Sequence, residues 1–322
     1  MRVKLLQYIS MSPILVSGSI AYDRIMEFGG RFKEHLLPDK LDHISVSFTV
    51  DTFAEGFGGT AGNIAYNLAL LGEHPTIIAT AGNDFEKYAA WLSKCGIDAS
   101  SIAIAKDVPT ASAYMIADTG DNQIAAFYIG AMARPYEAAV PATKDSIAII
   151  SPGNNTDMAS LARSYRALGV KYLYDPGQQA IMMTKDDLRA GIEGAGVLFC
   201  NEYELSIMIE RTGWTKKEIA DHVPTIIVTL AEKGTLLVQK GSEIGISAVP
   251  VEHVVDPTGA GDAYRAGFIK GMRIGSSVEM CIKLASTVAA YAVEQKGTQN
   301  HSFTTEELKT RFAEAYGQAL AL

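Results

Sequence analysis

Short runs rich in β-branched residues recur along the chain and restrict it to the α/β class more firmly than any other feature. These runs are "PILVSG" (13–18), "TIIATAG" (76–82), "IAIISPG" (147–153), "VKYLYDPG" (170–177), "VLFCN" (197–201) and "TIIVTL" (225–230). Most of them are followed by an amphipathic segment of helical length, which predicts a central, mainly parallel β-sheet flanked by helices. "TIIVTL" is apolar throughout instead of alternating, as expected for a strand that is covered on both faces.

Two segments, at about 22–52 and 109–130, depart from this alternation. Both resemble strands joined by polar turns and lack a clear crossover helix, and the second predicts a hairpin that turns at "TGDN". Two such ribbons need each other to bury an apolar face. The sequence therefore predicts one α/β domain over residues 13–322, with a small discontinuous β lid inserted from these segments and residues 1–12 as an N-terminal extension.

Charge, hydropathy and cysteine usage exclude several classes of partner and of structural site. The chain has 28 Lys and Arg against 36 Asp and Glu, and no block of like charges, so neither a nucleic-acid polymer nor a membrane surface is an expected partner. Its apolar stretches fall short of the roughly 18 residues that a membrane span needs. Three widely spaced cysteines, Cys95, Cys200 and Cys281, fit neither a disulfide framework nor a zinc site and predict a reduced, cytoplasmic protein.

Several common catalytic motifs are missing from the sequence. It contains no G-x-x-x-x-G-K-[ST] phosphate loop, no H-E-x-x-H and no G-x-S-x-G. The six histidines are scattered, which is typical of surface or core residues instead of metal ligands. P-loop, zinc-protease and serine-hydrolase chemistry are therefore not expected.

The stretch "DPTGAGDAYRAG" (256–267) places small residues directly before a predicted helix. Unpaired backbone N–H groups and a positive partial charge at a helix start attract anions, and Gly259, Ala260 and Gly261 allow close approach of a phosphate. Asp262 beside the anion is suited to accept a proton from an attacking hydroxyl. The alternative is that Asp262 only caps the helix. The Gly-Ala-Gly run favours binding, because a cap needs no room for such an approach.

A second glycine-rich helix start is "EGFGGTAGNIAYNLALLG" (55–72). Its glycines match the dinucleotide pattern G-x-G-x-x-A weakly, which keeps a NAD-dependent dehydrogenase as a remote alternative. The matching residues are Gly56, Gly58 and Ala61, with Asp84 in place of the ribose-binding acid. The match is weak because that motif belongs directly after the first strand, about 40 residues upstream. Glycines that merely let a helix pack on a sheet explain the pattern equally, although Asn63 in the first turn favours a binding role.

The stretch "CNEYEL" (200–205) follows a predicted strand. Asn201 and Glu204 then lie at the carboxyl end of a strand, where open α/β sheets bind ligands, and their oxygens suit Mg²⁺. The same two residues also fit a capping box that starts the next helix. The sequence does not decide between these two roles.

Taken together, and in their order along the chain, these stretches resemble the ribokinase family of carbohydrate and nucleoside kinases, the PfkB type. "DPTGAGDAYRAG" is the most specific signature, "FGGTAGNIAYNLALLG" is its usual companion, and "NEYE" matches the family's N-x-x-E. The resemblance covers nearly the whole chain. It implies a ribokinase-like fold, a β lid, and transfer of the ATP γ-phosphate to a substrate hydroxymethyl group.

The resemblance also implies roles for individual residues. Asp262 would be the general base, and the anion hole would consist of Gly259, Ala260 and Gly261. The sugar hydroxyls would be bound by Asp23, Gly58, Gly59 and Asn63. Mg-ATP would be organised by Asn201 and Glu204, while the nucleotide would also contact Thr229, Gly234 and Gly261, with residues 293–297 near the adenine. The family commonly has glycine where Ala231 stands.

Finer features are similar to the prokaryotic nucleoside kinases often labelled adenosine kinase. These features include "IGAM", which adds Met132 to the substrate site, "YDPGQ" (174–178) and "ERTGW" (210–214). One departure is Tyr128-Ile129, where that branch tends to have His-Pro. The resemblance thus implies an ATP- and Mg²⁺-dependent kinase for the ribose 5′-hydroxyl of a nucleoside, with a ribokinase- or fructokinase-like sugar kinase as the alternative. The preferred base, activation by a monovalent cation, and the choice between monomer and homodimer stay open.

Overall fold

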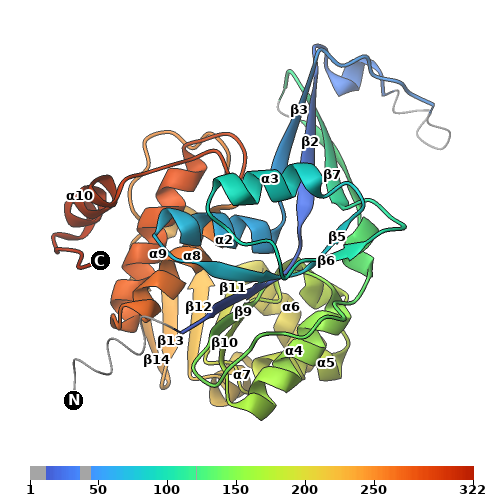
Figure 1. The fold of residues 1–322 in the computed structure, drawn as a ribbon. Helices are drawn as coiled ribbons and strands as arrows, with labels where there is room; N and C mark the ends of the chain where they lie inside the picture. Colours follow the sequence, from blue (N-terminus) through green and yellow to red (C-terminus); the bar gives the residue numbers. More distant parts are fainter. Residues whose placement is uncertain (1–11, 37–44, 121) are drawn as a thin grey trace.

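The computed structural model describes residues 12–36, 45–120 and 122–322 (Figure 1). Its central sheet has the strand order β14-β13-β12-β11-β10-β9-β1-β4. The strands are β1 (Ile14–Ser17), β4 (Pro75–Ile78), β9 (Ile147–Ile150), β10 (Lys171–Tyr174), β11 (Val197–Asn201), β12 (Thr225–Thr229), β13 (Thr235–Gln239) and β14 (Ser242–Ile246). The pairs from β4 to β12 are parallel, and β13 and β14 continue the sheet in antiparallel fashion. The predicted mainly parallel sheet is confirmed, and each predicted run forms a strand.

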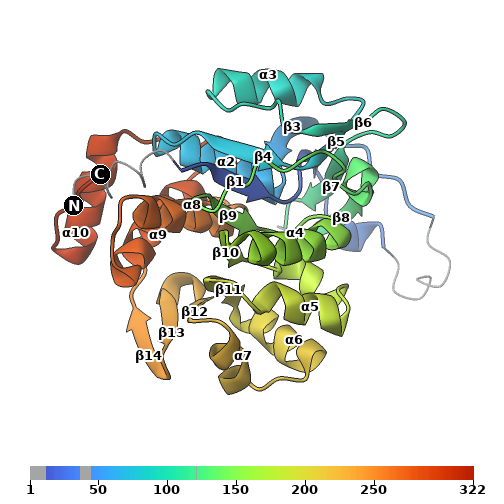
Figure 2. The same cartoon turned by 60° about the horizontal axis from the view of Figure 1, so that its bottom comes forward.

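Helices cover both faces of this sheet (Figures 1 and 2). One face carries α2 (Thr60–Leu70), α8 (Ala260–Arg273) and α9 (Val278–Val293), and the other carries α4 (Asn155–Leu168), α5 (Lys185–Ile192), α6 (Glu202–Thr212) and α7 (Lys216–His222). Further out, α10 (Thr305–Tyr316) packs on α9, and α3 (Glu86–Lys94) connects the parallel pair β5 (Thr80–Gly82) and β6 (Ala103–Ala105). Short 3₁₀ helices are η1 (Phe32–Glu34), η3 (Gly130–Ala133), η4 (Gly177–Ile181) and η5 (Ala231–Lys233). Within the described ranges, no helix has the length and apolarity needed to cross a bilayer.

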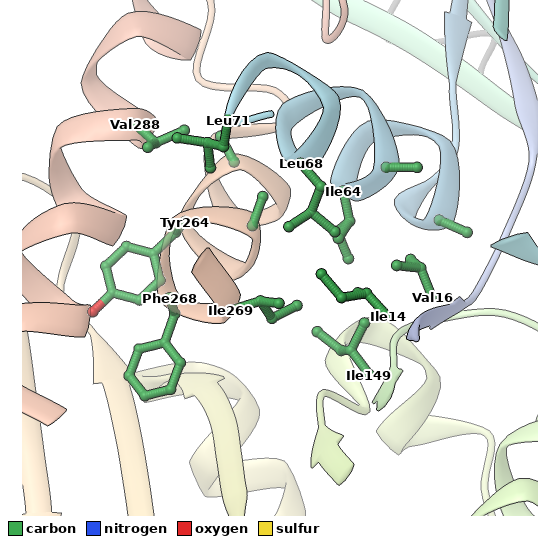
Figure 3. Packing of buried hydrophobic residues seen from close by; sticks show 14 of the residues in the cluster. Ile14, Val16, Ile64, Leu68, Leu71, Ile149, Tyr264, Phe268, Ile269 and Val288 are labelled. Carbon is green, nitrogen blue, oxygen red and sulfur yellow. The ribbon is translucent and has the colours of Figure 1, made fainter. Parts of the chain in front are cut away.

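The packing of α2 and α8 above strand β1 sets the position of both helices (Figure 3). Ile64 and Leu68 of α2 are fully buried and face Ile14 and Val16 of β1. Ile269 of α8 packs into the same cluster. Burial of each such side chain stabilises the fold by about 1.5–3 kcal/mol. The two helices therefore lie side by side with their amino ends fixed relative to the sheet.

A separate sheet with the order β3-β2-β7-β8 projects from the central body (Figure 1). Its strands are β2 (Ala21–Phe28), β3 (Thr52–Gly58), β7 (Ala111–Asp118) and β8 (Gln123–Tyr128). The predicted hairpin is confirmed, since β7 and β8 pair antiparallel on either side of "TGDN", of which Asp121 lies outside the described residues. The first predicted ribbon ends too early at 52, because β3 begins there and continues to Gly58 before α2 starts. Residues 1–11 of the predicted extension and 37–44 of the first ribbon lie outside the described residues.

The contact between α8 and α9 predicts that added volume at Gly267 will destabilise the protein. A Cβ atom at Gly267 would lie 2.7 Å from the Cα of Ala285 on α9. We expect Gly267→Ala to lower the free energy of unfolding by about 1–3 kcal/mol, although alanine favours a helix by about 1 kcal/mol. Urea denaturation measures this change. Gly245→Ala in β14 is the control, because nothing lies within 4 Å of that site, and equal stabilities for both variants would contradict the close packing.

Candidate active site

The carboxyl ends of the parallel strands and the amino ends of two helices meet at one edge of the central sheet. From β1 the chain continues to the neighbouring edge strand β4, and it then returns to β9 on the other side of β1. Such a reversal of strand order opens a crevice at the carboxyl ends, where open α/β sheets bind ligands. Asn201 ends β11 and Thr229 ends β12, while α2 and α8 begin near the same crevice.

Asp262 stands in the first turn of α8 and does not cap the helix. The N-cap is Gly259, whose φ of +79° lies in the left-handed region that favours glycine. The Asp262 carboxylate instead accepts a hydrogen bond of 2.8 Å from Nδ2 of Asn63 on α2. The capping alternative is therefore wrong. The N–H groups of Gly261 and Asp262 belong to the first helical turn, which offers them no intrahelical acceptor, so they are available to an anion.

The surroundings of Asp262 raise the pKa of its carboxyl toward neutral pH. Burial raises the pKa of Asp262 to about 7, and the negative charges of Asp175 and Asp23 act in the same direction. The hydrogen bond from Asn63 and the charge of Arg265 oppose this rise. A carboxyl with a pKa near the working pH is well matched to general-base catalysis.

Asp23, on strand β2, is close enough to act on the charge of Asp262, and the neighbouring Gly58 leaves room for its carboxylate. A Cβ atom at Gly58 would lie 2.2 Å from Oδ2 of Asp23, so only glycine leaves room for this carboxylate. Burial, with a smaller contribution from the charge of Asp256, raises the pKa of Asp23 to about 6. Gly59 has a φ of +86°, and a Cβ there would lie 2.6 Å from the Ser19 carbonyl oxygen. The structure thus places Asp23, Gly58, Gly59 and Asn63 on the Asp262 side of the crevice.

The dinucleotide pattern has a different structural basis. Gly56 and Gly58 lie within strand β3 of the small sheet, and not in the tight turn after the first strand of the central sheet. Asp84 accepts a 2.7 Å hydrogen bond from the backbone N–H of Thr110. The remote dehydrogenase alternative is therefore wrong, since the glycines do not form the phosphate-binding turn that it requires.

Asn201 and Glu204 form the capping box of α6, and their side chains satisfy each other's backbone N–H groups. Burial and then the charge of Asp175 raise the pKa of Glu204. The capping box engages only Oε2 of Glu204, so the other oxygen of this carboxylate, Oε1, is free. Among the described residues, no group of three acidic, histidine or cysteine side chains is arranged to hold a metal ion by itself.

Asp175 and Arg265 are functional candidates that the sequence analysis missed. Asp175 follows β10, and its Oδ2 accepts a 2.9 Å hydrogen bond from Nε of Arg265 on α8. Both side chains are about 6% exposed. The other oxygen of Asp175, Oδ1, is buried without a hydrogen-bond partner, so it is free for a cation. The position of Asp175 directly after a strand is the same signal that identified Asn201.

The remaining predicted residues are Met132, Thr229 and Gly234. Met132 in η3 is 7% exposed and packs with Ala21 and Ala111 of the small sheet, and Ala21 lies two residues before Asp23 on β2. Thr229 donates to the Cys200 carbonyl, and Gly234 has a φ of +96° in the turn between β12 and β13. Ala231 in the same turn has a φ of +51°, a conformation that favours glycine. Their roles in substrate and nucleotide binding stay predictions.

Comparison with known proteins agrees with this geometry. Residues 32–306 match the pfkB family of carbohydrate kinases. A nucleoside kinase of Methanothermobacter thermautotrophicus is 30% identical over 94% of this chain and 96% of its own length. One of Methanocaldococcus jannaschii is 28% identical over 85% and 91%. The structure of Burkholderia thailandensis nucleoside kinase in complex with inosine has 33% identity and a TM-score of 0.84, covering 95% of this chain and 100% of that one. The chain therefore belongs to the pfkB family of carbohydrate kinases and is a phosphotransferase that acts on an alcohol group.

Proposed function

We propose that this protein is an ATP-dependent nucleoside kinase that transfers the γ-phosphate to the ribose 5′-hydroxyl, with Asp262 as the general base. The observation that carries the proposal is the position of Asp262 at the start of α8, beside free backbone N–H groups and across from Asp23. The similar Burkholderia enzyme has been solved with inosine and with ADP-inosine, which supports both substrate classes.

Each group has a defined task in this reaction. Asp262 accepts the proton of the 5′-hydroxyl as the oxygen attacks, and the amino end of α8 stabilises the charge on the transferred phosphoryl group. Asp23 and Asn63 hold the ribose so that the hydroxyl and the phosphate are in line. Such positioning supplies about 7–11 kcal/mol of the rate enhancement in well-oriented reactions.

The negative charges around the crevice favour the binding of a cation. Asp23, Asp175, Glu204 and Asp262 lie near one another, and Arg265 is already paired with Asp175. The phosphates of ATP would add further negative charge. The free oxygens of Asp175 and Glu204 fit Mg²⁺, directly or through water. Bound Mg²⁺ neutralises phosphate charge during transfer.

The small sheet favours a nucleoside over a free sugar. The register places Ile25, Ala113, Met115 and Phe127 on the same sheet face as Asp23. Phe127 is 55% exposed, so an apolar surface continues outward from the carboxylate that we assign to the ribose. A nucleoside has a planar base beside its hydroxyls and can cover this surface, whereas a free sugar has no such group. Closure of the small sheet as a lid would exclude water from the reaction.

A substrate panel tests the proposed function. Inosine, adenosine and cytidine are compared with ribose and fructose in the presence of ATP and Mg²⁺, with ADP release and product mass as readouts. We expect nucleoside 5′-monophosphates as products and much slower turnover of both sugars. Faster phosphorylation of a free sugar would instead identify the protein as a sugar kinase.

The role of Asp262 predicts a specific pH dependence. The base must be ionised, and burial raises its pKa to about 7, so kcat/KM of the wild type should fall as the pH drops through about 7. Asp262→Asn should lower kcat by about 10²- to 10⁴-fold with little change in nucleoside affinity. Steady-state kinetics and a binding titration measure the two effects. Near-normal turnover by this variant would refute the assigned role.

The sugar site predicts a different phenotype for Asp23. Asp23→Ala removes a charged hydrogen-bond acceptor, so KM for the nucleoside should rise by about ten- to hundredfold while kcat changes less. A 2′,3′-dideoxynucleoside is the matched control, because it lacks the hydroxyls that Asp23 would bind. Wild type and variant should handle this analogue similarly. An unchanged KM for the ribonucleoside would contradict the assignment.

A further inference from the structure

A chain of hydrogen bonds runs from the half-buried Trp91 to Asp262. Nε1 of Trp91 on α3 donates to Oε1 of Gln299 over 2.8 Å, and Nε2 of Gln299 donates to Oδ1 of Asn63 over 3.0 Å. Nδ2 of Asn63 then donates to Oδ2 of Asp262 over 2.8 Å. The residues come from three helices and from the segment after α9, and the first and third links join groups 208 and 199 residues apart.

We propose that Trp91 and Gln299 are positioning residues that fix which end of the Asn63 amide faces Asp262. This inference rests on the proposed role of Asp262 as the general base.

The direction of the chain is set at Trp91. An indole N–H can only donate, whereas an amide side chain can present either its oxygen or its nitrogen. Because Gln299 turns its oxygen to Trp91, its nitrogen must face Asn63, where it also donates to the Tyr88 hydroxyl over 2.7 Å. Asn63 must then turn its oxygen to Gln299 and its nitrogen to Asp262. One donor-only group thus orients two amides in sequence.

Because both amides are buried, reversing the orientation of either one costs free energy. Asn63 is 4% exposed and Gln299 is 2% exposed, so bulk water cannot replace a misdirected bond. The Asn63 backbone is also held, because its carbonyl accepts a 2.9 Å bond from Nδ2 of Asn67. A reversed Asn63 amide would place its oxygen against the Asp262 carboxylate. Two acceptors can share that contact only if Asp262 is protonated, and a protonated Asp262 cannot act as a base.

Other charged groups face Asp262 but do not depend on Trp91. They are Arg265 on the same helix, Asp175 after β10 and Asp23 on β2. Tyr88 on α3 contacts the chain through its hydroxyl. A change confined to the Trp91 N–H leaves all of these groups in place, so its effect on Asp262 reports on the orientation of Asn63.

Trp91→Phe tests the proposal, because it removes the N–H and keeps an aromatic ring in the stack with Phe57, whose centroid is 5.3 Å away. Without the donor, Gln299 and Asn63 lose their fixed direction, and Asp262 loses a bond that favours its ionised form. We expect kcat/KM for the nucleoside to fall about tenfold at about pH 6, which corresponds to one unit of pKa, and to change less than about threefold at about pH 9, where Asp262 is ionised in either case. Gln299→Met should give the same pH-dependent loss.

Tyr66→Phe is the matched control. It removes a buried hydroxyl that donates 2.6 Å to the His301 carbonyl and that belongs to a ring next to Trp91, yet it leaves the chain intact. This control should keep the pH profile of the wild type even if its melting temperature falls. A wild-type profile in Trp91→Phe, or an equal loss at every pH as expected from structural damage alone, would overturn the proposal.

A readout without turnover separates this proposal from the proposed function. The Asp262 carboxyl can be titrated by NMR in protein labelled with ¹³C-aspartate, with its signal assigned by comparison with Asp262→Asn. A raised pKa in Trp91→Phe together with an inactive wild type would refute the nucleoside kinase and support the orienting chain. Nucleoside phosphorylation by the wild type together with an unchanged Asp262 titration in Trp91→Phe would refute the chain alone.

Discussion

The packing of helix α2 against helix α8 above strand β1 determines where the reactive groups lie. It brings Asn63 to Asp262 across 199 residues of sequence. Each helix begins directly after a glycine with a positive φ, Gly59 before α2 and Gly259 before α8. The backbone turns sharply at both glycines, so the amino end of each helix points toward the crevice. The apolar contacts behind the two amino ends therefore hold the geometry that the chemistry needs.

The same arrangement gathers carboxylates in a way that costs stability. The pKa of Asp262 is higher in the folded protein than in an unfolded chain, so its ionised form is disfavoured by folding. Asp262 lowers the free energy of unfolding least at a pH below its unfolded pKa of about 4. It lowers this free energy increasingly as the pH rises toward about 7. Asp23 contributes in the same direction over a narrower range, up to about 6. Such a loss of stability is a common cost of the groups that an active site needs.

The fold was largely predictable because its signals are local. Continuous apolar runs predicted the buried parallel strands, and the "TGDN" turn predicted the β7–β8 hairpin. The first ribbon was ended too early, at about 52, because the glycines of β3, among them Gly58, made the end of this strand resemble a helix start. Gly58 is required by the Asp23 carboxylate, a reason that only the pairing of β2 with β3 reveals.

The site was predictable in its outline and not in its connections. The motifs and the family resemblance identified Asp262, Asn63 and Asp23, which the structure brings to one crevice. Asp175 has a local signal, its position directly after a strand, but its pairing with Arg265 and the Trp91–Gln299 contact join distant segments, and no local pattern marks such contacts. The Gly-Ala-Gly run favoured a binding role for Asp262, whereas spacing left the role of Asn201 undecided; Gly259 is the N-cap of α8, and Asn201 is the N-cap of α6.

The most direct test of the account is a crystal structure of the wild-type protein with a nucleoside and a non-hydrolysable ATP analogue. It should place the 5′-hydroxyl oxygen within about 3 Å of the Asp262 carboxylate, with the γ-phosphate group against the N–H groups at the start of α8. A nucleoside bound with its 5′-hydroxyl directed away from Asp262, while the ATP analogue occupies its site, would contradict the central claim.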